Sequence, residues 1–315
     1  MTVRWGFIGA GFVAGRAMAP AVHAASGAML YAVASRDARR SAELEPQVVH
    51  ESYRALIEDP NIDAVYISLT NVQHLEWVVA ALEAGKHVLC EKPLALNADD
   101  VRTMQSAADR HQRLLVEAVW TRWQPRMKRM AEIVQRGDLG DISSISSTFT
   151  FQGDLIGNYR SQPEMGGGAL LDVGCYQAHL WLMLLGENVD ASVETVDIAT
   201  GPTGIDLTTK ARVTLNRAIR AEALSSFDMA PEQRIAVSGT SASMHTGEGE
   251  AFTLWKSDAT LIIGETIEKF APEDAFALMV QDVSAAIQGD DHGVFPSASS
   301  LRAAEILDAI RSFPN

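Results

Sequence analysis

The chain has 315 residues, 47% of them hydrophobic, and a formal net charge of -14 at pH 7. This length is sufficient for two domains, because one domain commonly takes about 100 to 200 residues. The acidic charge leaves no surplus of Lys and Arg for a phosphate backbone or an anionic membrane surface. We therefore expect neither nucleic acid nor a membrane as a partner.

Location and metal content follow from what the sequence does not contain. No signal-peptide pattern precedes the first apolar segment, and no apolar run approaches the ~18 residues of a membrane span, so we expect a cytoplasmic protein. Cys90 and Cys175 are too few and too far apart for a disulfide framework, and we expect two reduced thiols. No His, Cys or Glu spacing typical of a metal site occurs, so none is predicted.

The first part of the chain alternates short apolar strands with amphipathic segments, a pattern typical of a parallel sheet wrapped by helices. A helix is predicted to end at Gly85, a residue suited to a left-handed stop, and another to begin at Asn97. The predicted strands are 5–8, 30–34, 64–68, 87–90 and 114–117, and the predicted helices are 73–84 and 97–110. We assign residues 1–119 to one domain.

From Trp120 the pattern changes to longer strands with few helices between them, which indicates an antiparallel sheet. The predicted strands are 142–152, 193–199, 208–215, 219–226 and 234–238, and the predicted helices are 126–136, 170–185, 275–288 and 299–313. The fold class is therefore α/β, with a C-terminal α/β domain at 120–315 that contains a large, mainly antiparallel open sheet.

The glycines that follow the first strand predict a dinucleotide site. In a strand-turn-helix unit Gly9 permits the tight turn, Gly11 lets the backbone approach a pyrophosphate, and Ala14 is small enough for the helix to pack on the strand. The motif is weak alone, but its position at the start of a βαβ pattern favours the assignment. Phe12 and Val13 complete this predicted cofactor loop.

Ser35 and Arg36 at the end of the second strand favour NADP over NAD. A site for NAD would place a carboxylate there to bind the ribose 2′-hydroxyl, whereas a hydroxyl and a guanidinium suit a 2′-phosphate. Asp37 lies one position late for the carboxylate, so NAD stays an alternative, and a solvated loop cation is the plain interpretation of Arg36.

Candidate residues for proton transfer lie in two further motifs. Lys92 follows a buried strand, at the edge where ligands bind in open α/β sheets; the alternative is a surface Lys paired with Glu91. Asp172 and Tyr176 are four residues apart, so on a helix they share a face, with His179 one turn further. Tyr donates a proton well when a cation lies close. Packing in the core is the alternative for Tyr176 and the favoured one for His179.

These motifs together resemble the Gfo/Idh/MocA family of NAD(P)-dependent oxidoreductases. The resemblance covers nearly the whole chain and is most specific in the block from Ala84 to Pro93 and in the run from Gly166 to Tyr176. A further segment, Glu117 to Arg122, is similar to the branch that contains dimeric dihydrodiol dehydrogenases.

The resemblance implies an N-terminal Rossmann domain and roles for individual residues. Lys92 would be the catalytic lysine, before a cis proline bond, Tyr176 the acid/base and Asp172 its orienting carboxylate. Asn71, His74 and Glu91 would join Lys92 in the cofactor site, and Trp120 and Arg122, with His179, would line the substrate pocket.

The sequence therefore predicts an NADP-preferring oxidoreductase that transfers hydride between nicotinamide and a secondary alcohol or carbonyl of a sugar, cyclitol or dihydrodiol. The alternative is a non-catalytic, dinucleotide-sensing regulator on the same fold, because a fold does not establish activity. The family resemblance and the strand-rich second half also imply a homodimer or homotetramer formed through the C-terminal sheet.

Overall fold

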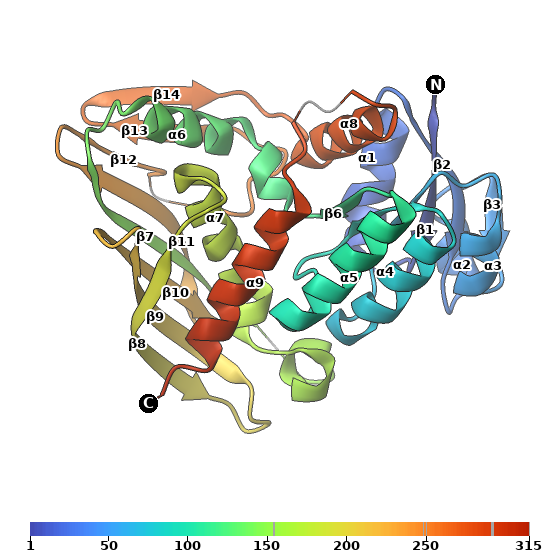
Figure 1. The fold of residues 1–315 in the computed structure, drawn as a ribbon, viewed down its shortest axis with the longest axis horizontal. Helices are drawn as coiled ribbons and strands as arrows, with labels where there is room; N and C mark the ends of the chain where they lie inside the picture. The colour runs from blue at the N-terminus through green and yellow to red at the C-terminus, as the bar shows by residue number, and fades with distance from the viewer. Residues whose placement is uncertain (154, 248, 250, 291–292, 315) are drawn as a thin grey trace. The chain divides into compact units, whose positions relative to one another are not determined.

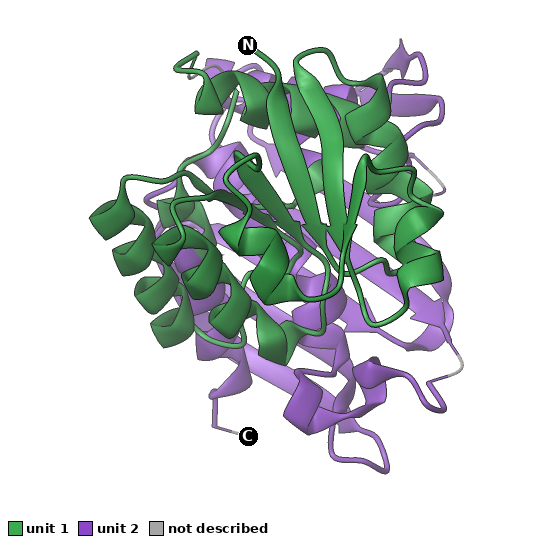
Figure 2. Cartoon of the chain, turned by 90° about the vertical axis from the view of Figure 1, so that its right-hand side faces the viewer, with its two compact units in different colours: residues 1–120, 274–300 green, residues 121–273, 301–315 purple. Residues whose placement is uncertain are grey.

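The computed structural model describes residues 1–153, 155–247, 249, 251–290 and 293–314. The chain divides into two compact units, coloured separately in Figure 2: residues 1–120 with 274–300, and residues 121–273 with 301–315. The sequence-based division placed everything after residue 119 in one domain. In the structure, residues 274–300 belong instead to the unit formed by the N-terminal half.

The first unit contains a six-stranded parallel sheet in the order β3-β2-β1-β4-β5-β6 (Figure 1). Its strands are β1 Val3–Ile8, β2 Ala28–Ala34, β3 Val48–His50, β4 Ala64–Ile67, β5 His87–Cys90 and β6 Leu115–Glu117. All four residues of β4 are fully buried, as expected for a central strand covered by helices on both faces. This is the predicted Rossmann arrangement; the short strand β3 was not predicted.

Helices connect these strands. They are α1 Ala19–Ala24, α2 Ala38–Ala42, α3 Tyr53–Glu58, α4 His74–Glu83 and α5 Ala98–His111, with α8 Ala275–Ile287 added from the C-terminal part of the chain. Gly85 ends α4 with φ +78°, and the Asn97 side chain caps α5 by accepting from Asp100 N–H, so both predicted boundaries are confirmed. Helix α8 packs beside α1 (Figure 1).

One buried hydrogen bond explains why α8 belongs to the first unit. Trp5 Nε1 on β1 donates to Ser284 Oγ on α8 at 3.1 Å, and both residues are at most 1% exposed. A buried indole N–H needs such a partner.

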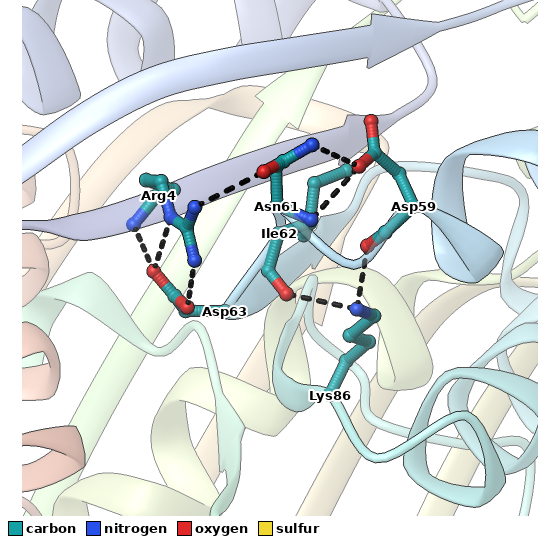
Figure 3. A network of polar contacts seen from close by, with 6 residues as sticks. All are labelled: Arg4, Asp59, Asn61, Ile62, Asp63 and Lys86. Atoms are coloured by element: carbon teal, nitrogen blue, oxygen red, sulfur yellow. Dashed lines mark hydrogen bonds and ion pairs between the residues drawn. The ribbon is translucent and has the colours of Figure 1, made fainter.

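A polar network accounts for the family-specific residues that precede β5 (Figure 3). The Lys86 ammonium is buried and donates to the carbonyl oxygens of Asp59 and Ile62 at 2.7 and 2.9 Å. Arg4 of β1 pairs with Asp63 through Nη2 and Oδ1 at 2.9 Å. Next to Lys86, His87 Nδ1 accepts from Leu114 N–H at 3.0 Å. These contacts fix the start of β5, and therefore the place where it ends.

The second unit contains an eight-stranded sheet in the order β14-β13-β12-β11-β7-β10-β9-β8. The strands are β7 Ile142–Gln152, β8 Ala191–Thr200, β9 Asp206–Leu215, β10 Ile219–Ser226, β11 Asp228–Gly239, β12 Ser243–His245, β13 Ala259–Ile263 and β14 Thr266–Phe270. Every pair is antiparallel except β7 with β10, so the sheet is mainly antiparallel as predicted. Strands β12 to β14 were not predicted.

The helices of this unit are α6 Pro125–Arg136, α7 Cys175–Leu185 and α9 Ser297–Arg311, the last of which starts in the first unit. Helix α7 is buried along most of its length and follows a π-helical turn at Leu170–Gly174. By length and composition Pro163–Leu185 would be apolar enough to cross a membrane, but 89% of its 18-residue window is buried inside the protein. It is thus a core helix.

Candidate active site

The predicted cofactor residues of the first unit gather at one edge of its sheet. Strands β1, β2, β4 and β5 are parallel, and their carboxyl ends lead into Gly9, Ser35, Ser68 and Glu91 respectively. The strand order reverses between β1 and β4, which are neighbours, and this switch point is where open α/β sheets bind dinucleotides.

The two motif glycines have different roles. Gly9 has φ +97°, and a Cβ there would lie 2.3 Å from the carbonyl oxygen of Ser68, so the fold itself requires glycine. At Gly11 the nearest atom to an added Cβ is Ser68 Oγ at 3.5 Å, an ordinary contact. The protein leaves the space over Gly11 open, and this fits a pyrophosphate on the helix that follows. Phe12 beside it is 72% exposed.

The loop after β2 presents Arg36 rather than a carboxylate. Asp37 Oδ1 accepts from Arg39 N–H at 2.9 Å and caps α2. The Ser35 hydroxyl donates to Asp37 O at 2.7 Å and lies 2.8 Å from Ser41 Oγ, so the hydroxyl that we expected to meet a 2′-phosphate is engaged within its own loop. Arg36 is exposed.

The segment that carries Lys92 is held by buried side chains from three directions. Tyr66 OH donates to Glu91 Oε1 at 2.7 Å, and the other Glu91 oxygen accepts from Lys92 N–H at 3.3 Å. His74 Nδ1 lies 3.0 Å from Pro93 O, and Glu117 Oε1 accepts from Leu94 N–H at 3.0 Å. The Lys92–Pro93 peptide bond is cis, as the family resemblance implied.

Burial sets the protonation of this cage. Burial, then the charge of Glu91, raises the pKa of Tyr66 well above its ordinary value, so the phenol stays a donor. Burial lowers the pKa of His74, although the carbonyl of Pro93 opposes this, so the imidazole is neutral. His74 was predicted to contact the cofactor, and Asn71 likewise. Both are buried in the structure, at 0% and 4% exposure, and the contact that the structure gives His74 is to the backbone after Lys92.

In the second unit the triple glycine is needed for contacts within the protein, which corrects its interpretation as a place of ligand approach. A Cβ on Gly167 would lie 2.4 Å from Arg160 O, and one on Gly168, at φ +111°, would lie 2.0 Å from Asp206 Oδ1. The other oxygen of Asp206 accepts from Leu170 N–H at 2.7 Å. Asp206 therefore caps the helix that carries Asp172 and Tyr176.

Asp172 and Tyr176 lie on this buried helix, at 5% and 7% exposure. Asp172 Oδ2 accepts from Arg160 Nε at 2.7 Å, a partner that the motif analysis did not include. The Tyr176 ring packs against Phe149 and Phe252, with ring centres 5.9 and 6.1 Å away. The helix thus combines an ion-paired carboxylate with a phenol in an apolar wall.

Three residues predicted to line the substrate pocket have structural contacts. Trp120 stacks on Phe276, with ring centres 5.4 Å apart, within the first unit. Arg122 Nη2 pairs with Glu187 Oε1 at 2.8 Å in the second unit, and His179 is 1% exposed on α7. Within the described ranges, no group of three or more His, Cys, Asp or Glu side chains is placed to hold a metal ion.

The glycine loop at the switch point of a parallel sheet, with Lys92 at the same edge, defines an oxidoreductase that uses NADP or NAD. Residues 3–119 match the family described as "Oxidoreductase family, NAD-binding Rossmann fold", and residues 127–245 match the "GFO/IDH/MocA C-terminal domain". The chain belongs to the Gfo/Idh/MocA family of oxidoreductases.

Similar proteins span nearly the whole chain. A D-xylose 1-dehydrogenase (NADP(+)) of Haloferax volcanii is 31% identical, over 97% of this chain and 95% of its own. The trans-1,2-dihydrobenzene-1,2-diol dehydrogenase of Mus musculus is 30% identical over 85% and 80%. A 3-ketoreductase from Actinomadura kijaniata, solved in complex with NADP and TDP-benzene, superimposes with a TM-score of 0.90 at 28% identity, covering 99% of this chain and 98% of its own.

Proposed function

We propose that this protein is a cytoplasmic, NADP-preferring oxidoreductase that transfers hydride between nicotinamide and a secondary alcohol or carbonyl carbon of a sugar, cyclitol or dihydrodiol. The observation that carries the proposal is the buried Asp172 on the helix of Tyr176, four residues before it, because a fixed phenol next to a carboxylate can move a hydroxyl proton. The activities of the xylose and dihydrodiol dehydrogenases and of the ketoreductase support the substrate class.

The reaction divides between cofactor and protein. Bound NADP supplies the hydride acceptor. In the oxidising direction Tyr176 accepts the substrate hydroxyl proton, Lys92 stabilises the negative charge that develops on oxygen, and Asp172 orients the phenol side of the site. Gly9, Gly11 and the neighbouring amides hold the pyrophosphate, while Glu91 holds the backbone of Lys92 through its N–H.

The preference for NADP is supported by the loop after β2. Asp37 is engaged as the N-cap of α2, and Arg36 is exposed at the position where the ribose substituent is read. A guanidinium there favours a phosphate over a hydroxyl.

The test is a titration of the purified protein with NADPH and NADH, followed by absorbance of reduced nicotinamide with aldoses, inositols, keto-sugars and trans-dihydrodiols. Turnover with any member supports the proposal and names the substrate class. Tight NADPH binding without turnover would favour the dinucleotide-sensing regulator, and no binding of either cofactor would exclude both. Wild-type turnover in both Lys92→Met and Tyr176→Phe would refute the assigned roles.

We also propose a homodimer or homotetramer formed through the open face of the C-terminal sheet. Lys210, Arg212 and Arg220 are exposed on adjacent strands there, and Arg212 Nε lies 3.3 Å from Glu222 Oε1. An interface with such charges weakens with salt. Sedimentation at low and high salt tests this, and a monomer under both conditions would exclude it.

A further inference from the structure

A cation outside the predicted motifs lies against the proposed acid/base helix. Arg160 belongs to a 3₁₀ turn, Tyr159–Ser161, and its Nε donates to Asp172 Oδ2 at 2.7 Å. The Asp172 side chain is 8% exposed and that of Arg160 is 31% exposed. Burial opposes the charge on Arg160, but the carboxylate of Asp172 outweighs it and raises the pKa of the guanidinium above its ordinary value. The pair is therefore ionic.

The backbone around the triple glycine holds Arg160 in place. Gly168 N–H donates to Arg160 O at 3.0 Å, and Gly167 lies so close to that oxygen that no side chain fits between them. The guanidinium carbon lies 4.9 Å from the centre of the Tyr159 ring, within the range of a cation–π contact. Arg160 is thus fixed at both its backbone and its side chain, unlike a solvated surface arginine.

The position of this pair connects it to proton transfer. Asp172 lies within the π-helical turn Leu170–Gly174, and Tyr176 follows on the next turn of the same helix. The charge on Arg160 also interacts electrostatically with Tyr176. We infer that Arg160 is a positioning residue of the proposed reaction, which holds the Asp172 carboxylate ionised and in one orientation on the helix of Tyr176. This inference rests on the proposed function.

The kinetic test replaces the cation in graded steps. Arg160→Gln lowers kcat by about a hundredfold, the loss typical of a misplaced catalytic group, while KM and NADPH affinity stay within about threefold. Arg160→Lys keeps the charge without the planar fork and recovers part of the loss. Added guanidinium restores part of the activity of Arg160→Ala, and urea does not. The control is Arg217→Gln, an arginine with a 91% exposed side chain near Asp190, whose kcat stays at the wild-type value.

A double-mutant cycle decides whether Arg160 acts through Asp172. In an Asp172→Asn background, Arg160→Gln is expected to change kcat by less than about twofold, because the partner it positions is already gone. Losses that multiply in the double variant would overturn the inference, as would a wild-type kcat in Arg160→Gln.

Amide hydrogen exchange gives a readout that needs no turnover. Arg160→Gln and Asp172→Asn are each expected to speed exchange across residues 170–176 by about tenfold, with little change in the parallel sheet of the first unit. Unchanged exchange in both would overturn the inference even if the wild type turns over no substrate. Should Arg160→Gln fail to fold, Arg160→Lys carries the same comparison. A wild type that binds NADPH but lacks turnover refutes only the proposed function.

Discussion

Replacing Gly9 and Gly11 in turn by alanine separates a glycine that the fold needs from one that the cofactor needs. At Gly9 the added Cβ would overlap the carbonyl of Ser68 at 2.3 Å, and φ is +97°. Backbone strain of this kind costs about 1–3 kcal/mol before any shift of Ser68 is counted. We expect Gly9→Ala to lower the melting temperature by roughly 5–10 °C and to weaken NADPH binding as well.

Gly11→Ala is expected to behave differently. Its methyl meets only Ser68 Oγ at 3.5 Å, so the melting temperature stays near the wild-type value. The same methyl separates the loop amides from the pyrophosphate, and one lost charge-assisted hydrogen bond is worth about 1.5–3 kcal/mol. This corresponds to a loss of NADPH affinity of about ten- to a hundredfold.

The assay is thermal unfolding without cofactor, paired with titration of NADPH by fluorescence. Wild-type NADPH affinity in Gly11→Ala would refute the assignment of that space to the pyrophosphate. Wild-type melting of Gly9→Ala would refute the steric argument at Ser68.

Three further predictions concern the first unit. Arg36→Ala is expected to weaken NADPH binding by about tenfold and leave NADH binding within about twofold, because only NADPH carries the 2′-phosphate; equal losses would contradict this. Burial, followed by the charge of Arg113, lowers the pKa of His87 from 6.5 to about 4, so the unfolded chain binds a proton that the folded state refuses. Stability should therefore fall as pH drops from 6.5 towards 4, and His87→Asn should flatten this slope in urea unfolding at a series of pH values. Lys86→Met removes two hydrogen bonds to buried carbonyl oxygens and should cost about 2–4 kcal/mol in chemical unfolding; a loss below about 0.5 kcal/mol would contradict it.

Local patterns were sufficient for most elements of the fold. The strands of the parallel sheet are short buried apolar runs, and the ends of α4 and α5 follow from Gly85 and Asn97, residues that act through their own backbone neighbourhood. Strands β13 and β14 were missed although Gly264 and Glu265, between two β-rich runs, carry the signal of a two-residue hairpin.

Contacts between distant positions could not be predicted in this way. Helix α8 is readable as a helix, but its place in the first unit depends on contacts such as Trp5 to Ser284, 279 positions apart. Arg160 was missed because its partner Asp172 lies across an irregular segment whose path depends on Gly167 and Gly168 packing against their neighbours. No periodicity relates such residues.

The π-helical turn at Leu170–Gly174 has a consequence for how sequences of this kind tolerate insertions and deletions. A wide turn holds one residue more than the α-helix around it. Losing one residue there would convert the turn to regular helix and rotate everything after it by about 100° relative to everything before. Tyr176 would then face away from Phe149 and Phe252, while the length of the segment would be almost unchanged. Point substitutions can therefore accumulate along this helix more readily than a single-codon deletion within its first turn.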